Sequence, residues 1–256
     1  MADVVEDNED SSAPAVPPPV DGAASEGGEV RSARLEAMVA KRKTNFSYLQ
    51  RAHVSSSHQA SVFWLNCVRI KEAALQEYIT SIPAERTLSF YYLALSLGKL
   101  AVQKPSCGIE RSMLQLWEEF EYHFANSASK FLKYNTSRNA DCFVPELGAC
   151  SESGNVGLCR FSSEIVYSEL QTPHLSFPLS YVEVLQSLLS SLEQVYNRFV
   201  EEESWATTAG YEAVIKVDAK VKHFVINPIA RELTQLSIKE LQVSVASELR
   251  EKGGAR

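Results

Sequence analysis

Apolar residues recur every three or four positions along most of the chain. This spacing puts them on one face of an α-helix. It predicts helices over residues 31–53, 60–82, 84–103, 109–134 and 179–204, and a last helical stretch over 210–250. The fold class that follows is all-α, a multi-helix bundle of about six to seven helices.

Two of these helices have a distinctive pattern. Residues 84–103 are apolar almost all round, which predicts the central place in the bundle. Residues 179–204 carry a heptad seam, which is too short for a free-standing coiled coil and therefore favours packing inside the bundle. The seam residues are Val182, Leu185, Leu189, Leu192, Tyr196 and Phe199.

The last helical stretch contains an Asn227-Pro228 pair. Pro228 would kink a continuous helix, because it lacks an N–H and clashes with the preceding turn. Alternatively Asn227 caps a new helix with Pro228 in its first turn. Both alternatives stay open, and we favour a break with an immediate restart.

Two regions lack helical periodicity. Residues 1–30 are acidic and rich in Pro, Gly and Ala, which predicts a disordered tail. Residues 135–178 are punctuated by Gly and Pro and predict a long irregular loop. The predicted domain therefore spans 31–250, with helical halves 31–134 and 179–250 and a frayed end at 251–256.

Charge is concentrated at the N-terminus. The net charge is -7, and residues 1–30 contribute eight acids and no base, so the rest of the chain sums to +1. A broad surface for nucleic acid is therefore not expected. Lys41, Arg42 and Lys43 form a basic cluster, which a solvated helix face explains better than a phosphate contact or a nuclear signal.

The N-terminus has no signal-peptide pattern, and no apolar run is long enough to cross a membrane. We expect a chain without a transmembrane segment that resides in the cytoplasm, with the nucleus as the alternative. The five cysteines are an odd number, which predicts free thiols rather than a disulfide framework.

Recognisable catalytic and phosphate-binding motifs are absent from the sequence. Cys142, Cys150 and Cys159 with His174 might suggest a zinc site, but spacings of eight and nine residues do not fit the close pairs of such sites. We therefore predict no catalytic residues, no metal and no cofactor, and we do not expect an enzyme.

The leading hypothesis is a non-catalytic scaffold, adaptor or complex subunit that binds another protein through apolar helix faces. The predicted contact residues are Val225, Ile229, Leu233 and Leu236. Alternatives are a homo-oligomer, a nucleic-acid or membrane-surface protein that uses the basic cluster, and a helical enzyme whose site is assembled from distant residues.

Overall fold

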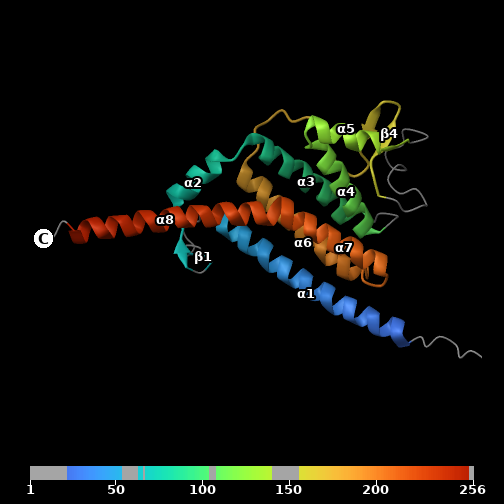
Figure 1. Cartoon of the computed structure of the whole chain (residues 1–256), viewed down its shortest axis with the longest axis horizontal. Coiled ribbons are helices and arrows are strands. Elements are labelled where there is room, and N and C mark those ends of the chain that lie inside the picture. Colours follow the sequence, from blue (N-terminus) through green and yellow to red (C-terminus); the bar gives the residue numbers. More distant parts are fainter. Residues whose placement is uncertain (1–21, 54–62, 66, 104–107, 140–155, 254–256) are drawn as a thin grey trace, which may run out of the picture.

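The computed structural model describes residues 22–53, 63–65, 67–103, 108–139 and 156–253. These residues are mostly helical, which confirms the all-α prediction (Figure 1). The elements are α1 (Gly22–His53), β1 (Phe63–Trp64), β2 (Val68–Arg69), α2 (Glu72–Ser81), α3 (Ala84–Val102), α4 (Ile109–His123), α5 (Ser127–Asn135), β3 (Arg138–Asn139), β4 (Cys159–Phe161), β5 (Glu164–Val166), α6 (Tyr181–Glu201), α7 (Thr208–Val221), the π-helix η1 (Lys222–Ile226) and α8 (Asn227–Gly253).

Helix α6 is the centre of the bundle. It packs extensively against both α3 and α1, and its predicted heptad seam is buried except for the half-buried Val182. The prediction that 84–103 is central is wrong, because the outer side of α3 carries the exposed Leu95 and Val102. An all-round apolar pattern therefore does not identify the central helix here.

A buried ion pair joins α1 to α7. Arg42 donates from Nε to Asp218 Oδ1 at 2.6 Å and from Nη2 to Oδ2 at 3.0 Å. The Tyr196 hydroxyl of α6 donates to the same Oδ1 at 2.9 Å. Burial acts to raise the pKa of Asp218, but the hydrogen bonds from Arg42 outweigh it and hold that pKa below its usual value.

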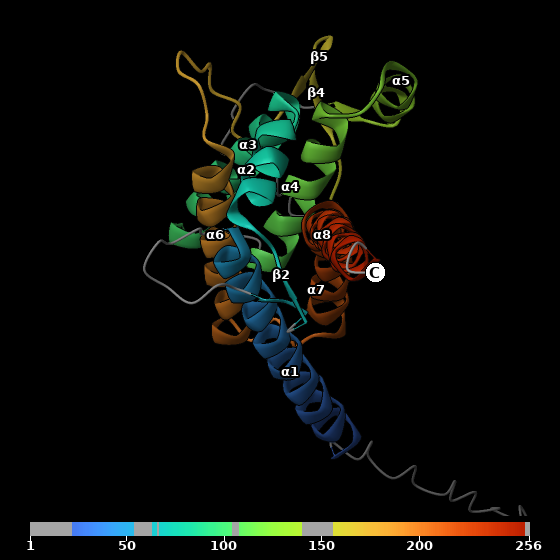
Figure 2. The same ribbon diagram turned by 90° about the vertical axis from the view of Figure 1, so that its left-hand side faces the viewer.

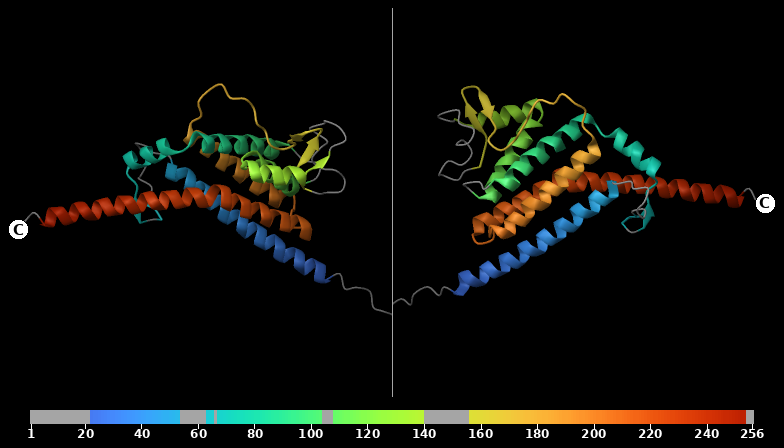
Figure 3. Two further views of the ribbon diagram at one scale, coloured as in Figure 1. Left: turned by 45° about the horizontal axis from the view of Figure 1, so that its top comes forward. Right: turned by 180° about the vertical axis from the view of Figure 1, so that it is seen from behind.

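The last two helices are continuous through Pro228, as Figures 1 and 3 show. The Asn227 N–H donates to the Lys222 carbonyl, five residues back, so η1 shifts the hydrogen-bond register by one residue. This π-turn accommodates the missing N–H of Pro228 without ending the helix. The favoured break at Asn227 is therefore wrong.

The predicted helix over 60–82 is replaced at its start by a hairpin. Strands β1 and β2 pair antiparallel, and only Glu72–Ser81 forms helix α2. The stretch before α2 is rich in aromatic and β-branched residues, which favour extended structure. Trp64 also stacks on Tyr48 of α1 and donates from Nε1 to Thr234 Oγ1 of α8 at 3.0 Å.

Two more boundaries differ from the sequence prediction. The helix expected over 109–134 is divided into α4 and α5, because Asn126 caps α5 by accepting a hydrogen bond from the Ser129 N–H at 2.9 Å. The irregular region 135–178 contains a small sheet in which β4 pairs parallel with β3 and antiparallel with β5.

The chain ends also differ. Helix α1 begins at Gly22 rather than at residue 31, and Arg31 Nε donates to the Trp205 carbonyl at 3.0 Å. The predicted disordered tail is therefore helical over 22–30, while residues 1–21 lie outside the described part. Helix α8 reaches Gly253, inside the stretch predicted to fray.

A buried carboxylate fixes the segment that leaves β5. Glu119 of α4 is fully buried, and its two oxygens accept from the backbone N–H groups of Ser168, Glu169 and Leu170 at 2.7–2.9 Å. Gln115 Nε2 also donates to this carboxylate, at 2.8 Å. From this anchor, residues 171–180 arch past α3 to the start of α6 (Figures 1 and 3).

We expect Arg42→Met to lower the free energy of unfolding by about 3 kcal/mol, because it leaves Asp218 charged and buried. The double variant Arg42→Met/Asp218→Leu should lose less, since no buried charge remains unpaired. Lys222, which also pairs with Asp218 at 3.1 Å, has a side chain that is 42 % exposed and can be solvated. Urea denaturation of both variants at neutral pH measures the difference. Equal losses would contradict a dominant role for the ion pair.

Glu119→Gln should lower the free energy of unfolding by about 2–4 kcal/mol, because an amide NH₂ would face backbone N–H donors. Hydrogen exchange at residues 168–170 should become faster. The matched control is Glu118→Gln on the same helix, where the side chain is half-buried and pairs with Lys133 at 3.2 Å. A similar loss in both variants would argue against the anchor.

Candidate interaction surface

The predicted contact residues belong mainly to the core. Val225, Ile229 and Leu233 are completely buried within the chain, and Leu236 is half-buried. The side chains of Val225, Ile229 and Leu233 are not available to a partner, so the choice of these three as contact residues is wrong, while a contact at Leu236 stays a prediction. Their spacing does mark an apolar face, but that face packs inside the same chain.

The distal part of α8 carries an apolar stripe that nothing in the described chain covers. Ile238, Leu241, Val245 and Leu249 follow one another at spacings of three, four and four, which places them on one helix face. Their exposed fractions are 48, 47, 55 and 66 %. In Figures 1 and 3 this end of α8 extends away from the bundle, and Figure 2 looks along it from the C-terminus. We call these four residues the α8 stripe.

The β1–β2 hairpin borders the same face of α8. Thr234, which accepts the hydrogen bond from Trp64, lies one turn before Ile238 on that face. Phe63 and Leu65 of the hairpin are exposed by 49 and 61 %. The hairpin and distal α8 together hold seven of the sixteen large apolar side chains that are exposed among the described residues.

The hairpin tip has a specific and strained conformation. Leu65 has a φ of 50°, in the left-handed region that a branched side chain rarely adopts. The Tyr48 hydroxyl holds it there by accepting from the Leu65 N–H at 2.7 Å and donating to the Phe63 carbonyl at 2.9 Å. Strain that the surroundings maintain is often found at binding sites.

A polar cluster clamps the base of distal α8 to the bundle. Glu232 of α8 accepts from the Tyr78 hydroxyl of α2 at 2.8 Å and from Arg86 Nη1 of α3 at 2.5 Å. The rings of His53 and Tyr181 pack beside it. The cluster therefore links α1, α2, α3, α6 and α8, and it positions the helix from which the α8 stripe projects.

His53 is a buried titratable group in this cluster. Its Nδ1 lies 2.8 Å from the Leu49 carbonyl, and its Nε2 has no hydrogen-bond partner among the described residues. Burial lowers the pKa of His53, and the nearby charge of Arg86 adds to this effect. The folded state therefore favours the neutral ring.

The predicted basic cluster is divided by the fold. Lys41 is exposed, Arg42 is buried against Asp218, and Lys43 Nζ is 3.8 Å from Glu193 Oε1 of α6. Only Lys41 has no ion-pair partner among the described residues. The three residues therefore do not form one basic patch.

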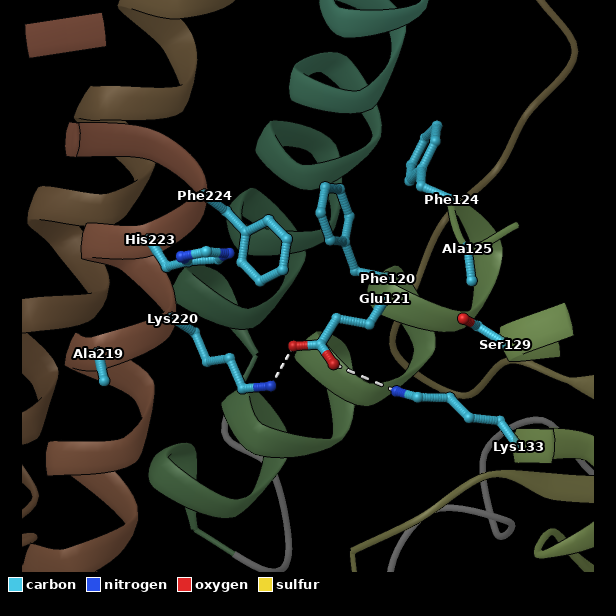
Figure 4. Close-up of a pocket in the computed structure, with 10 residues that line it drawn as sticks. All are labelled: Phe120, Glu121, Phe124, Ala125, Ser129, Lys133, Ala219, Lys220, His223 and Phe224. Atoms are coloured by element: carbon cyan, nitrogen blue, oxygen red, sulfur yellow. Dashed lines mark hydrogen bonds and ion pairs between the residues drawn. The ribbon is translucent and has the colours of Figure 1, made fainter. Parts of the chain in front are cut away.

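A groove of about 590 Å³ lies between α4, α5 and the α7–η1 helix (Figure 4). The rings of Phe120 from α4 and Phe224 from η1 pack edge to face and line one side of the groove. Glu121 lies at the opposite side and pairs with both Lys220 of α7 and Lys133 of α5. Burial acts to raise the pKa of Glu121, but the two lysines outweigh it and lower that pKa. These pairs span the groove and link its three walls.

Only two of the cysteine and histidine candidates, Cys159 and His174, belong to the described residues. Cys159 is half-buried in β4 and His174 is exposed, whereas Cys142 and Cys150 lie outside the described residues. Within the ranges that the structure describes, no group of three or more His, Cys, Asp or Glu side chains is placed to hold a metal ion. None of the helices in these ranges has the length and apolarity of a membrane span.

Scans against protein-family models, and searches of curated proteins and of solved structures, find no match to the chain. Inference about function therefore rests on the geometry of its own surfaces.

We expect the stability of the protein to fall as the pH drops from about 6.5 to 5, because the unfolded His53 takes up a proton that the folded state resists. Since the folded pKa is depressed, this contribution is fully present above the unfolded pKa and is lost on acidification. His53→Gln should flatten this part of the pH profile. Urea midpoints across the interval measure it, and an unchanged slope would assign the effect to other groups.

Proposed function

We propose that the chain is a non-catalytic helical binding module that docks another protein on the surface formed by the α8 stripe and the β1–β2 hairpin tip. The observation that carries the proposal is the α8 stripe itself. Four large apolar side chains lie on one face of a helix that extends beyond its own bundle, and no other described residue covers them.

The marginal stability that is expected for distal α8 without a partner supports this proposal. An isolated helix of this length is marginal in water, and its stability normally comes from packing of an apolar face. Each stripe residue is about half-exposed, so covering it contributes on the order of 1 kcal/mol. A partner would therefore stabilise the helix as well as bind to it.

The chemistry of the surface suggests the kind of partner. A stripe with spacings of three and four matches the apolar face of another helix, and Phe63 and Leu65 add a lateral contact. Because the contact is apolar, it should tolerate salt. Arg42 is engaged with Asp218, so a salt-sensitive nucleic-acid or membrane contact through the basic cluster has less support.

We also propose that the chain is not an enzyme and that it acts inside the cell. Two ion pairs support the proposal that the chain is not an enzyme, because their charged groups join helices. Arg42 pairs with Asp218, and Arg86 pairs with Glu232.

The test compares the full chain with Leu241→Asp/Val245→Asp and with the control Phe131→Asp/Leu132→Asp. The control changes two apolar residues of α5 that are more exposed, at 67 % each, than Leu241 and Val245, at 47 and 55 %. Circular dichroism should show that all three proteins fold, since the changes are at the surface. Proteins captured from cells by the wild type and the control, but not by the α8 variant, are candidate partners.

Each candidate is then purified and titrated at low and high salt. We expect the α8 variant to weaken binding at least tenfold, with little salt dependence for the wild type. Light scattering of the chain alone shows whether the partner is a second copy. Binding that is unaffected by the α8 changes, or that disappears at high salt, would overturn the proposal.

A further inference from the structure

The α8 stripe is complementary to itself when a second copy of the helix lies against it in the opposite direction. An antiparallel pair whose two-fold axis passes midway along the stripe brings Ile238 level with Leu249 of the second copy. The same axis brings Leu241 beside Val245 of the second copy. Each of the four side chains therefore meets an apolar side chain, and each contact joins a leucine to a β-branched residue.

The stripe runs almost parallel to the helix axis. Ile238 and Leu249 are eleven residues apart, which is close to three full turns and leaves a drift of only about 20°. Two such stripes stay in contact over their whole length without strong supercoiling. Partial exposure of all four side chains, from 47 to 66 %, shows that each has area left to bury.

The charges of distal α8 do not oppose such a pair. The seven residues Leu241–Ser247, which surround the two-fold axis, include no charged residue. Glu240 precedes them, but it pairs with Lys71 of its own chain at 3.4 Å, and its side chain is only 15 % exposed. The centre of an antiparallel pair therefore brings no like charges together, and the contact there is apolar.

The β1–β2 hairpin lies where the far end of the second helix arrives. The same two-fold axis places Gly253 of the second copy level with Thr234, which accepts the hydrogen bond from Trp64 of the hairpin. Phe63 and Leu65 are exposed at that level. One helix from a second copy therefore covers both the α8 stripe and the hairpin tip.

The position of the bundle determines the direction of pairing. The bundle packs against only one end of α8, as Figures 1 and 3 show. In a parallel pair the two bundles and the two hairpins would lie at the same end and compete for the same space. In an antiparallel pair the bundles lie at opposite ends, and only the distal parts of the two helices overlap.

We propose that the partner of the α8 stripe is a second copy of this chain, and that the two α8 helices pair antiparallel. This inference rests on the proposed function, because it names the molecule that docks on the stripe and the hairpin tip. The contact uses six large side chains from each copy, fewer than the roughly 20–30 residues a side of a standard interface. The dimer is therefore weak and reversible.

The first measurement is sedimentation equilibrium of the full chain between about 1 and 300 µM, because small interfaces bind at the weak end of the range. The mass should rise from 28.4 kDa towards twice that value, with a dissociation constant in the micromolar range. Because the contact is apolar, raising the salt should change this constant by less than about threefold. A monomer at every concentration would overturn the proposal.

The second measurement tests the antiparallel register with Leu241→Lys and Val245→Glu. Each variant alone should weaken the dimer at least about tenfold, because both symmetric contacts then place a charge against an apolar side chain. An equimolar mixture should recover dimerisation, since the new lysine of one copy faces the new glutamate of the other while the second contact stays apolar. In a parallel pair these two positions do not face each other, so the mixture would not recover.

The matched control is Leu132→Lys and Phe131→Glu on α5, which should leave the dimer unchanged. Circular dichroism checks that each variant keeps its helical content. A dimer that ignores the α8 changes, or a mixture that stays monomeric, would overturn the proposal.

The two proposals also fail separately. A monomeric chain that still captures a different protein through the α8 stripe would keep the docking surface and reject the second copy as its partner. A monomeric chain whose captured proteins do not depend on the α8 stripe would reject both.

Discussion

The burial of α6 is the interaction on which the rest of the structure depends. Its seam residues Leu185, Leu189 and Leu192 are completely buried, and the helix contacts both α1 and α3. Helices of this kind gain little stability from propensity alone, so α1 and α3 remain ordered because α6 covers their apolar sides. The outer side of α3 carries the exposed Leu95 and Val102.

Ion pairs and hydrogen bonds then determine the register of the helices against one another, which apolar packing alone does not specify. Hydrophobic burial is non-directional, whereas a two-bond contact such as Arg42–Asp218 fits only one arrangement of α1 against α7. Glu232 has the same effect at the other end of the long helix, where it fixes α8 to α2 and α3. The bundle is thus held at two widely separated points along α7–η1–α8.

The periodicity of the sequence was sufficient to predict the helical class and most of the core. The α6 seam is an example, because its heptad spacing required a partner on that face. Periodicity does not show whether an apolar face packs within its own chain or against another molecule. For this reason the sequence predicts an interface at Val225, Ile229 and Leu233, although these residues are buried. The α8 stripe has an equally regular spacing, but the charges after Glu240 are typical of a solvated helix end.

Contacts between distant residues were beyond the reach of sequence patterns. Arg42 reads as part of a basic cluster, and only the fold brings it to Asp218, 176 positions away. The hairpin was missed for a related reason, since Trp64 is extended in order to reach Tyr48 and Thr234.

The π-turn at 222–226 has a geometric consequence for everything that follows it. A π-turn is equivalent to one residue inserted into an α-helix, and one residue corresponds to about 100° of rotation and 1.5 Å of rise. The azimuth at which α8 leaves the bundle is therefore set by a single position. A homologous chain that lacked this residue would keep the same core helices but aim the far end of α8 in a different direction.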